Sequence, residues 1–143
     1  MNVFIIGSAF DTALILDKKR LNKQIVECGQ ILKAIIGETK AWANHPCTIQ
    51  YKAHKEWLYD YMLCLELYRL GDFNLSQYYS LECEKKKPSF HTEAFFNQMK
   101  RRLYTKNNDY YKQWSHLGES EVNWYYPNGV WKYYKNGKEI KYE

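Results

Sequence analysis

The stretch Leu16-Asp17-Lys18-Lys19-Arg20-Leu21-Asn22-Lys23-Gln24-Ile25-Val26-Glu27 decides the fold that we predict for this chain. Its apolar residues recur three or four positions apart, which is the spacing of one face of an α-helix. The same spacing continues on both sides of the stretch. We therefore predict one long helix from about Asp11 to Ile36, with Gly37 as its C-cap.

Polar side chains of the same stretch, Arg20, Lys23, Gln24 and Glu27, share a second face of the predicted helix, because side chains three or four residues apart meet there. One interpretation is a solvated face with a Lys23–Glu27 ion pair, worth about 0.3–0.5 kcal/mol. The other is a phosphate site in which Arg20 and Lys23 bind the anion. Glu27, a carboxylate beside two cations, would then stay ionised and act as a base or an electrostatic stabiliser.

Hydrophobic spacing elsewhere predicts a mainly α chain. Asn44-His45-Pro46 precedes a second helical pattern, with Asn44 as the expected N-cap, and that pattern ends at Gly71. Thr92 precedes a third pattern. Before the first helix, the apolar run Val3–Ile6 predicts a short strand or an extended arm. The expected fold is a compact bundle of about three main helices with a short N-terminal strand.

The C-terminal region has a different pattern, which predicts a β-hairpin. Asn136-Gly137 is a preferred centre of a tight turn, because both residue types tolerate positive φ. The turn would join residues 130–134 to residues 139–142. We therefore expect a helical domain over residues 1–120 and an aromatic, lysine-rich hairpin appendage over residues 121–143, packed on that domain.

Composition favours a partner that carries phosphate or bases. Tryptophan, tyrosine and phenylalanine together make up 25 of 143 residues, and the net charge is +5. Between residues 85 and 112, eight lysines and arginines face only two acids. Aromatic rings stack on bases, although they equally fit a hairpin packed on a helical body, and both interpretations stay open. The candidate phosphate or nucleotide ligands outside the first helix are His45, Lys100, Arg101, Arg102, Trp131, Lys132 and Tyr134.

Membrane, secreted and metal-binding classes are not favoured. No apolar run approaches the ~18 residues of a membrane span, and the first residues lack the charged start of a signal peptide. The four cysteines contain no Cys-x-x-Cys pair, and no histidine has a partner at ligand spacing. We expect buried free thiols, no metal site and a cytoplasmic location.

The stretch of residues 16–27, followed by Gln30-Ile31-Leu32 and Trp42-Ala43-Asn44-His45-Pro46, resembles a family of small bacterial and viral proteins related to the pyrimidine-dimer DNA glycosylases. The resemblance covers about residues 1–72. More loosely, Val130-Trp131-Lys132-Tyr133-Tyr134-Lys135 resembles the aromatic and lysine-rich tail of the family enzyme. It implies a compact, mostly helical protein without a cofactor or metal, with DNA as its partner, in a bacterium or a virus-infected cell.

The resemblance also implies a mechanism. In that family an N-terminal amine attacks the sugar carbon, an imine forms, and a glutamate on a helix assists beside arginines that bind phosphate. An α-amine suits this role because its ordinary pKa of about 7.7–8.0 leaves part of it neutral. The nucleophile here would be the amine of Met1 or Asn2. Arg20 occupies the family's glutamate position, so Glu27 or Asp17 would be the assisting carboxylate.

Two other classes of function fit the same residues. One is a non-catalytic binder, or sponge, of a nucleotide or another phosphorylated signalling molecule, held by the polar face of residues 20–27. The other is a protein-interaction module that uses the tyrosine-rich surface.

Overall fold

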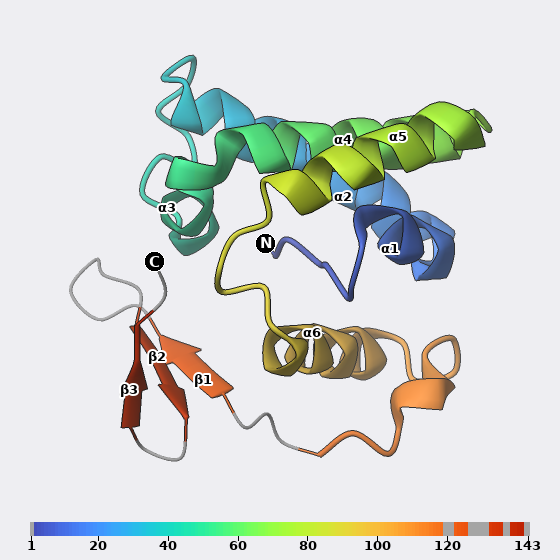
Figure 1. Cartoon of the computed structure of the whole chain (residues 1–143), viewed down its shortest axis with the longest axis vertical. Coiled ribbons are helices and arrows are strands. Elements are labelled where there is room, and N and C mark those ends of the chain that lie inside the picture. The colour runs from blue at the N-terminus through green and yellow to red at the C-terminus, as the bar shows by residue number, and fades with distance from the viewer. Residues whose placement is uncertain (1, 119–121, 126–131, 136–137, 142–143) are drawn as a thin grey trace. The chain divides into compact units, whose positions relative to one another are not determined.

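The computed structural model describes residues 2–118, 122–125, 132–135 and 138–141 (Figure 1). This part of the chain is mainly helical, as predicted, with more helices than the about three expected. The helices are α1 (Ala9–Ile15), α2 (Lys18–Ile35), α3 (Pro46–Tyr51), α4 (Lys55–Arg69), α5 (Phe73–Lys85) and α6 (Glu93–Lys106), with short 3-10 helices η1 (Lys52–His54) and η2 (Lys112–Trp114). None of the described helices combines the length and the hydropathy needed to span a bilayer.

Contacts divide the chain into two compact units, residues 1–88 and 89–143. The expected division into residues 1–120 and 121–143 stays a prediction about which parts fold on their own. The first unit contains α1 to α5, and the second contains α6, η2 and a small sheet. Each unit has its own buried residues.

The predicted long helix is in fact two helices, because the chain extends at Leu16 and Asp17. Their ψ angles are 134° and 155°, so α1 ends before them and α2 begins after them. The C-cap is Ile36, one residue before the predicted Gly37. Gly37 has φ 83°, and this left-handed residue lets the N–H of Glu38 donate to the carbonyl of Lys33 at 2.9 Å.

The second helical pattern divides into α3, η1 and α4. Its expected N-cap, Asn44, is wrong by one residue. His45 is the cap, because its Nδ1 accepts the N–H of Cys47 at 3.1 Å and Pro46 occupies the first helical position. The imidazole therefore supplies the acceptor that an asparagine side chain was expected to supply.

Helix α4 is the centre of the first unit and packs against α1, α2 and α5. Leu58, Tyr61 and Leu65 on α4 are fully buried. Facing them, α5 presents small side chains, and the hydroxyl of Ser76 donates to the carbonyl of Cys64 at 2.8 Å. Serine in this position allows α5 to approach α4 closely, and the two helices run side by side in Figure 1.

Residues 2–5 form an extended arm and not the expected strand. Val3, Phe4 and Ile5 are buried, so their backbone groups need partners away from water. In the described residues these partners are side chains of the helices and no strand, so the segment is an arm without a sheet.

The second unit contains a three-stranded antiparallel sheet in the order β1 (Val122–Tyr125), β2 (Lys132–Lys135), β3 (Lys138–Ile140). The predicted hairpin is confirmed, since Lys135 pairs with Lys138 on either side of residues 136–137, which lie outside the described residues. The pairing of β1 with β2 was not predicted. The expected packing of the hairpin on the helical body stays a prediction.

Candidate functional site

The N-terminal arm is held on α2 by the side chain of Gln24. This residue is only 2% exposed, its Oε1 accepts the N–H of Phe4 at 2.6 Å, and its Nε2 donates to the carbonyl of Asn2 at 2.8 Å. One amide side chain thus pairs with two backbone groups of the arm, as a neighbouring strand would. Gln24 was also predicted to bind phosphate. Both ends of its amide bind the arm, so Gln24 could contact a phosphate only after the arm is released, and that role stays a prediction.

Two further side chains fix the arm. The hydroxyl of Tyr61, from α4, donates to the carbonyl of Phe4, and Oγ1 of Thr12, from α1, accepts the N–H of Ile6 at 3.1 Å. Burial raises the pKa of Tyr61 well above its ordinary value, so the phenol keeps the proton that it donates. No local signal in the sequence indicates the partner of Tyr61, because Phe4 lies 57 residues away.

Glu27 lies one turn of α2 beyond Gln24, on the side of the helix that holds the arm. Its side chain is 12% exposed, and Oε1 lies 3.9 Å from Nζ of Lys23. The expected Lys23–Glu27 ion pair is therefore present. Because the lysine side chain is 66% exposed, water screens the pair, and Lys23 remains accessible to an anion.

The pKa of His45, which caps the start of α3, responds to two opposite charges. Its pKa lies below the ordinary value, first because burial disfavours the imidazolium and then because of the positive N-terminal amine, while Glu27 acts in the opposite direction. With Nδ1 accepting from Cys47, the neutral ring carries its proton on Nε2. We call His45, Glu27 and the N-terminal amine the amine cluster. Met1 itself lies outside the described residues.

Trp42 is a further residue next to His45. Its φ of 64° is in the left-handed region, which is uncommon for a bulky residue, and its ring meets the ring of His45 edge-on at 5.3 Å. The ring is exposed. Strained backbone of this kind gathers at functional sites, and the only sequence signal for Trp42 is that it opens the motif ending in His45 and Pro46.

The other predicted carboxylate, Asp17, is the N-cap of α2. It is ten residues before Glu27, which corresponds to about 15 Å along the helix. Its Oδ2 lies 3.7 Å from Nη1 of Arg20 in the first turn. Arg20 shares a face of α2 with Gln24 and Glu27, at about 10 Å from Glu27 along the helix axis. Glu27 is thus close enough to His45 to affect its pKa, whereas Asp17 lies apart from Glu27.

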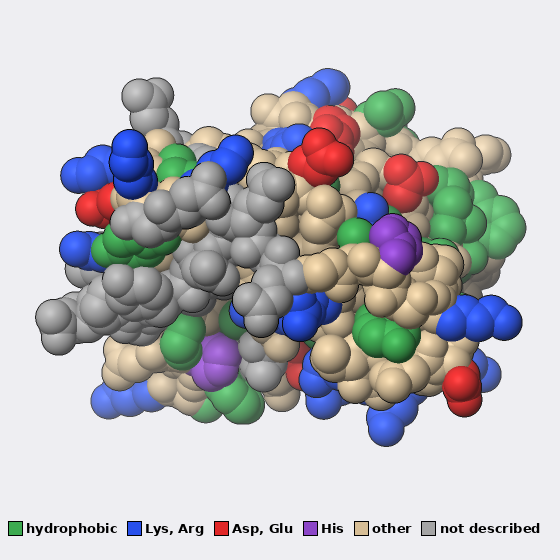
Figure 2. All heavy atoms as spheres, turned by 90° about the horizontal axis from the view of Figure 1, so that it is seen from below, with side chains coloured by type: hydrophobic (Ala, Val, Ile, Leu, Met, Phe, Trp, Pro, Cys, Tyr) green, Lys and Arg blue, Asp and Glu red, His purple; other side chains and the backbone are tan. Residues whose placement is uncertain are grey.

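The candidate cations Lys100, Arg101 and Arg102 belong to the second unit, where all three are half-buried on α6. Nζ of Lys100 lies 6.0 Å from the ring centre of Trp114, and that ring stacks on Tyr111 at 5.4 Å. On the face seen in Figure 2, Lys and Arg side chains are spread along the surface with acidic side chains among them.

Strand β2 carries two further candidates, Lys132 and Tyr134, both half-buried. Between them, Tyr133 is buried and stacks on Phe90 at 5.8 Å. The alternation expected of a strand therefore holds over these residues, with Tyr133 inward and its neighbours more accessible. Trp131 lies outside the described residues.

All four cysteines are buried free thiols, as predicted. Burial raises the pKa of Cys28 and of Cys83, which keeps both thiols protonated. Within the part of the chain that the structure describes, no three His, Cys, Asp or Glu side chains are grouped as metal ligands would be.

Comparison with known proteins gives a match for the N-terminal arm and the helices that follow it. Residues 1–69 match the family model described as pyrimidine dimer DNA glycosylase. A search of the curated proteins and of the solved structures gives no significant match. The matched segment contains the arm, α1 to α4, Glu27 and His45, and it includes the motifs between residues 16 and 46 that carried the resemblance; the looser tail motif at residues 130–135 lies outside it. Residues 1–69, just under half of the chain, are therefore similar to the pyrimidine dimer DNA glycosylase family.

Proposed function

We propose that the chain is a DNA glycosylase with abasic-site lyase activity, which acts on damaged DNA through its N-terminal amine. The observation that carries this proposal is the hold of Gln24 on the arm. Two hydrogen bonds fix the backbone at Asn2 and Phe4, one helical turn from Glu27. A nucleophile at the start of such an arm stays close to a carboxylate, which lowers the entropic cost of reaction.

The reaction follows from these groups. The amine lone pair attacks C1′ of the damaged nucleotide, and the base leaves with the electrons of the glycosidic bond and takes up a proton. Opening of the sugar at O4′ gives a protonated imine, and loss of a C2′ proton then expels the 3′ phosphate. Glu27 accepts the proton that the amine loses, a role that contributes about 10²–10⁴-fold in rate.

The cations have the task of binding the DNA backbone. Arg20 and Lys23 would bind the phosphates beside the damaged nucleotide, and His45 would donate from Nε2. Lys100, Arg101, Arg102, Lys132 and Tyr134 would supply contacts that do not depend on sequence. A lesion weakens base stacking, so extruding the damaged nucleotide costs less there than elsewhere in the duplex.

Borohydride trapping on DNA that contains an abasic site tests the proposal. We expect a covalent adduct that mass spectrometry maps to the N-terminal peptide. Glu27→Gln should reduce the rate of adduct formation by about 10²–10⁴-fold. Asp17→Asn is the matched control, since it also neutralises a carboxylate of the same helix, and it should leave the rate nearly unchanged.

Absence of an adduct from the folded chain would overturn the lyase assignment. An adduct on an internal lysine would overturn the role of the amine. If no adduct forms and the purified chain retains a nucleotide, the result supports the sponge.

A further inference from the structure

A cavity of about 310 Å³ lies in the first unit, away from the amine cluster. Leu32 and Ile36, at the C-terminal end of α2, form part of its lining. These two residues lie about 140° and 180° around the helix from Glu27, at ~100° per residue. The cavity therefore opens on the opposite side of α2 from the carboxylate that faces the arm. The remaining lining residues are Lys55, Glu56, Tyr59, Asp60 and Lys86.

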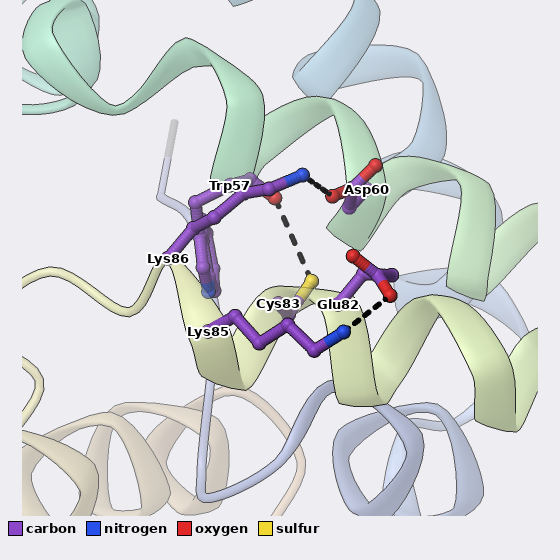
Figure 3. A network of polar contacts seen from close by, with 6 residues as sticks. All are labelled: Trp57, Asp60, Glu82, Cys83, Lys85 and Lys86. Carbon is purple, nitrogen blue, oxygen red and sulfur yellow. Dashed lines mark hydrogen bonds and ion pairs between the residues drawn. The ribbon is translucent and has the colours of Figure 1, made fainter.

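A buried carboxylate and an ammonium group lie side by side in this lining. Asp60 is only 7% exposed, and its Oδ2 lies 2.6 Å from Nζ of Lys86. In Figure 3 the second oxygen of Asp60 points away from the lysine, and no described residue donates a hydrogen bond to it. Lys86 has further donor hydrogens beyond the one that Asp60 accepts. The pair thus offers one free acceptor and one donor next to each other.

The surrounding contacts hold this pair in place. The thiol of Cys83 donates to the carbonyl of Trp57 at 3.6 Å, which ties the end of α5 to the start of α4 (Figure 3). Lys85 is engaged by Glu82 at 2.9 Å on the same helix, and so Lys86 is the lysine that reaches Asp60. The Cys83–Trp57 contact fixes the backbone next to Lys86, and the lysine side chain, 41% exposed, reaches Asp60 from there.

The rest of the lining is apolar or balanced in charge. Tyr59 exposes about half of its surface (51%), and Ile36 is also exposed. Lys55 and Lys86 are matched by Glu56 and Asp60, so the lining has no net charge. Such a lining disfavours a free phosphate or a cation. It suits an uncharged planar ring whose edge carries a donor and an acceptor.

We propose that this cavity binds the base of a free nucleoside, with the ring against Tyr59 and the edge on Asp60 and Lys86. Nucleobases combine a flat apolar face with adjacent N–H donors and acceptors, which the lining matches group by group. The cavity is on the far side of α2 from Glu27, so its occupant is a second molecule and not the nucleotide attacked by the amine. This inference goes beyond the proposed function and does not depend on it.

Calorimetric titration of the full chain with adenosine, guanosine, cytidine and uridine tests this inference. We expect at least one nucleoside to bind saturably, and Tyr59→Ala to weaken that binding about tenfold. Tyr78→Ala is the matched control, because Tyr78 is 52% exposed and does not line the cavity. Asp60→Asn replaces one carboxylate oxygen, an acceptor, by an NH₂ group, a donor. This variant should therefore change which nucleoside binds best.

Two results would overturn the inference: no nucleoside binds saturably, or the two tyrosine variants weaken binding equally. A single-stranded oligonucleotide that competes for the cavity with the same affinity as the free nucleoside would overturn the assignment, since a base of the strand would then be the occupant. Glu27→Gln should leave nucleoside binding unchanged, and Tyr59→Ala should leave borohydride trapping unchanged. Failure of one proposal is thereby distinguishable from failure of the other.

Discussion

The two units of the chain fix their extended segments with different partners. In the first unit, the arm is held by hydrogen bonds to its backbone from Gln24, Tyr61 and Thr12. In the second unit, the backbone of β2 pairs with β1 and β3, and its inward side chain Tyr133 stacks on Phe90, which contacts Phe95 edge-on. The family match covers the hydrogen-bonded arm and none of the second unit.

The proposed function offers a reason for this difference. Hydrogen bonds lose strength steeply with distance and angle, so they hold a backbone to within a few tenths of an ångström. Ring contacts tolerate several geometries at similar energy. A nucleophile requires the first kind of hold, whereas a surface that follows a phosphate backbone works with the second. The comparison predicts that damage to one unit has different consequences from damage to the other.

The largest expected effect is that of Phe95→Ala in the second unit. Phe95 is 1% exposed and contacts the rings of Phe90, His91 and Phe96. Removing a buried phenylalanine costs about 3–5 kcal/mol of stability. Hydrogen exchange should show lost protection in residues 89–143 and little change in residues 1–88.

Leu58→Ala in α4, which empties a fully buried position of the first unit, gives the reciprocal test. It should lower protection in residues 1–88 first. Equal loss of protection in both units from either variant would contradict the division of the chain after residue 88.

The next effect is that of Gln24→Ala, which removes the amide from the arm. It leaves the N–H of Phe4 and the carbonyl of Asn2 without that partner, at a cost of about 1–3 kcal/mol in the free energy of unfolding. The chain should stay folded, yet the rate of borohydride trapping should fall strongly, because Gln24 no longer holds the arm that carries the amine. Gln30→Ala, on the same helix, should change neither the unfolding midpoint nor trapping by a comparable amount.

Local signals predicted much of this fold. The spacing of α2, the left-handed Gly37 after it and the pairing of β2 with β3 each depend on neighbouring residues, and the structure shows all three. The break at Leu16 and Asp17 was missed because α1 and α2 both continue an apolar spacing, so the pattern alone does not reveal the extended residues between them.

Most of the candidate site depends on contacts between residues far apart in sequence. Spacing placed Gln24 and Glu27 on one face, yet only the arm, 20 residues away, explains why Gln24 is buried. Tyr61 binds a carbonyl 57 residues away, and Lys86 meets Asp60 across 26 residues. No periodicity within one helix indicates such partners, so the cavity was not predicted at all.

The smallest effect concerns the pKa of His45 and tests the amine cluster without any reaction. Because its folded-state pKa is lowered, the stability that His45 contributes is complete above its ordinary value of about 6.5 and is lost as the pH falls below it. Acetylation of the N-terminal amine removes a positive charge, so the pKa of His45 should rise. Glu27→Gln removes a negative charge, so the same pKa should fall.

Opposite shifts of one imidazole are what two opposite charges near it require, and NMR titration of the histidine ring resonances measures them directly. His54 provides the internal control, because burial also lowers its pKa while its opposing charge is Glu56 and not Glu27 or the amine. If both changes left His45 unmoved, or moved His54 equally, the amine would not lie beside Glu27. The hydrogen bonds of the first unit would then hold the arm for stability alone. They would differ from the ring contacts of the second unit in chemistry, and no longer in the proposed roles of catalysis and DNA binding.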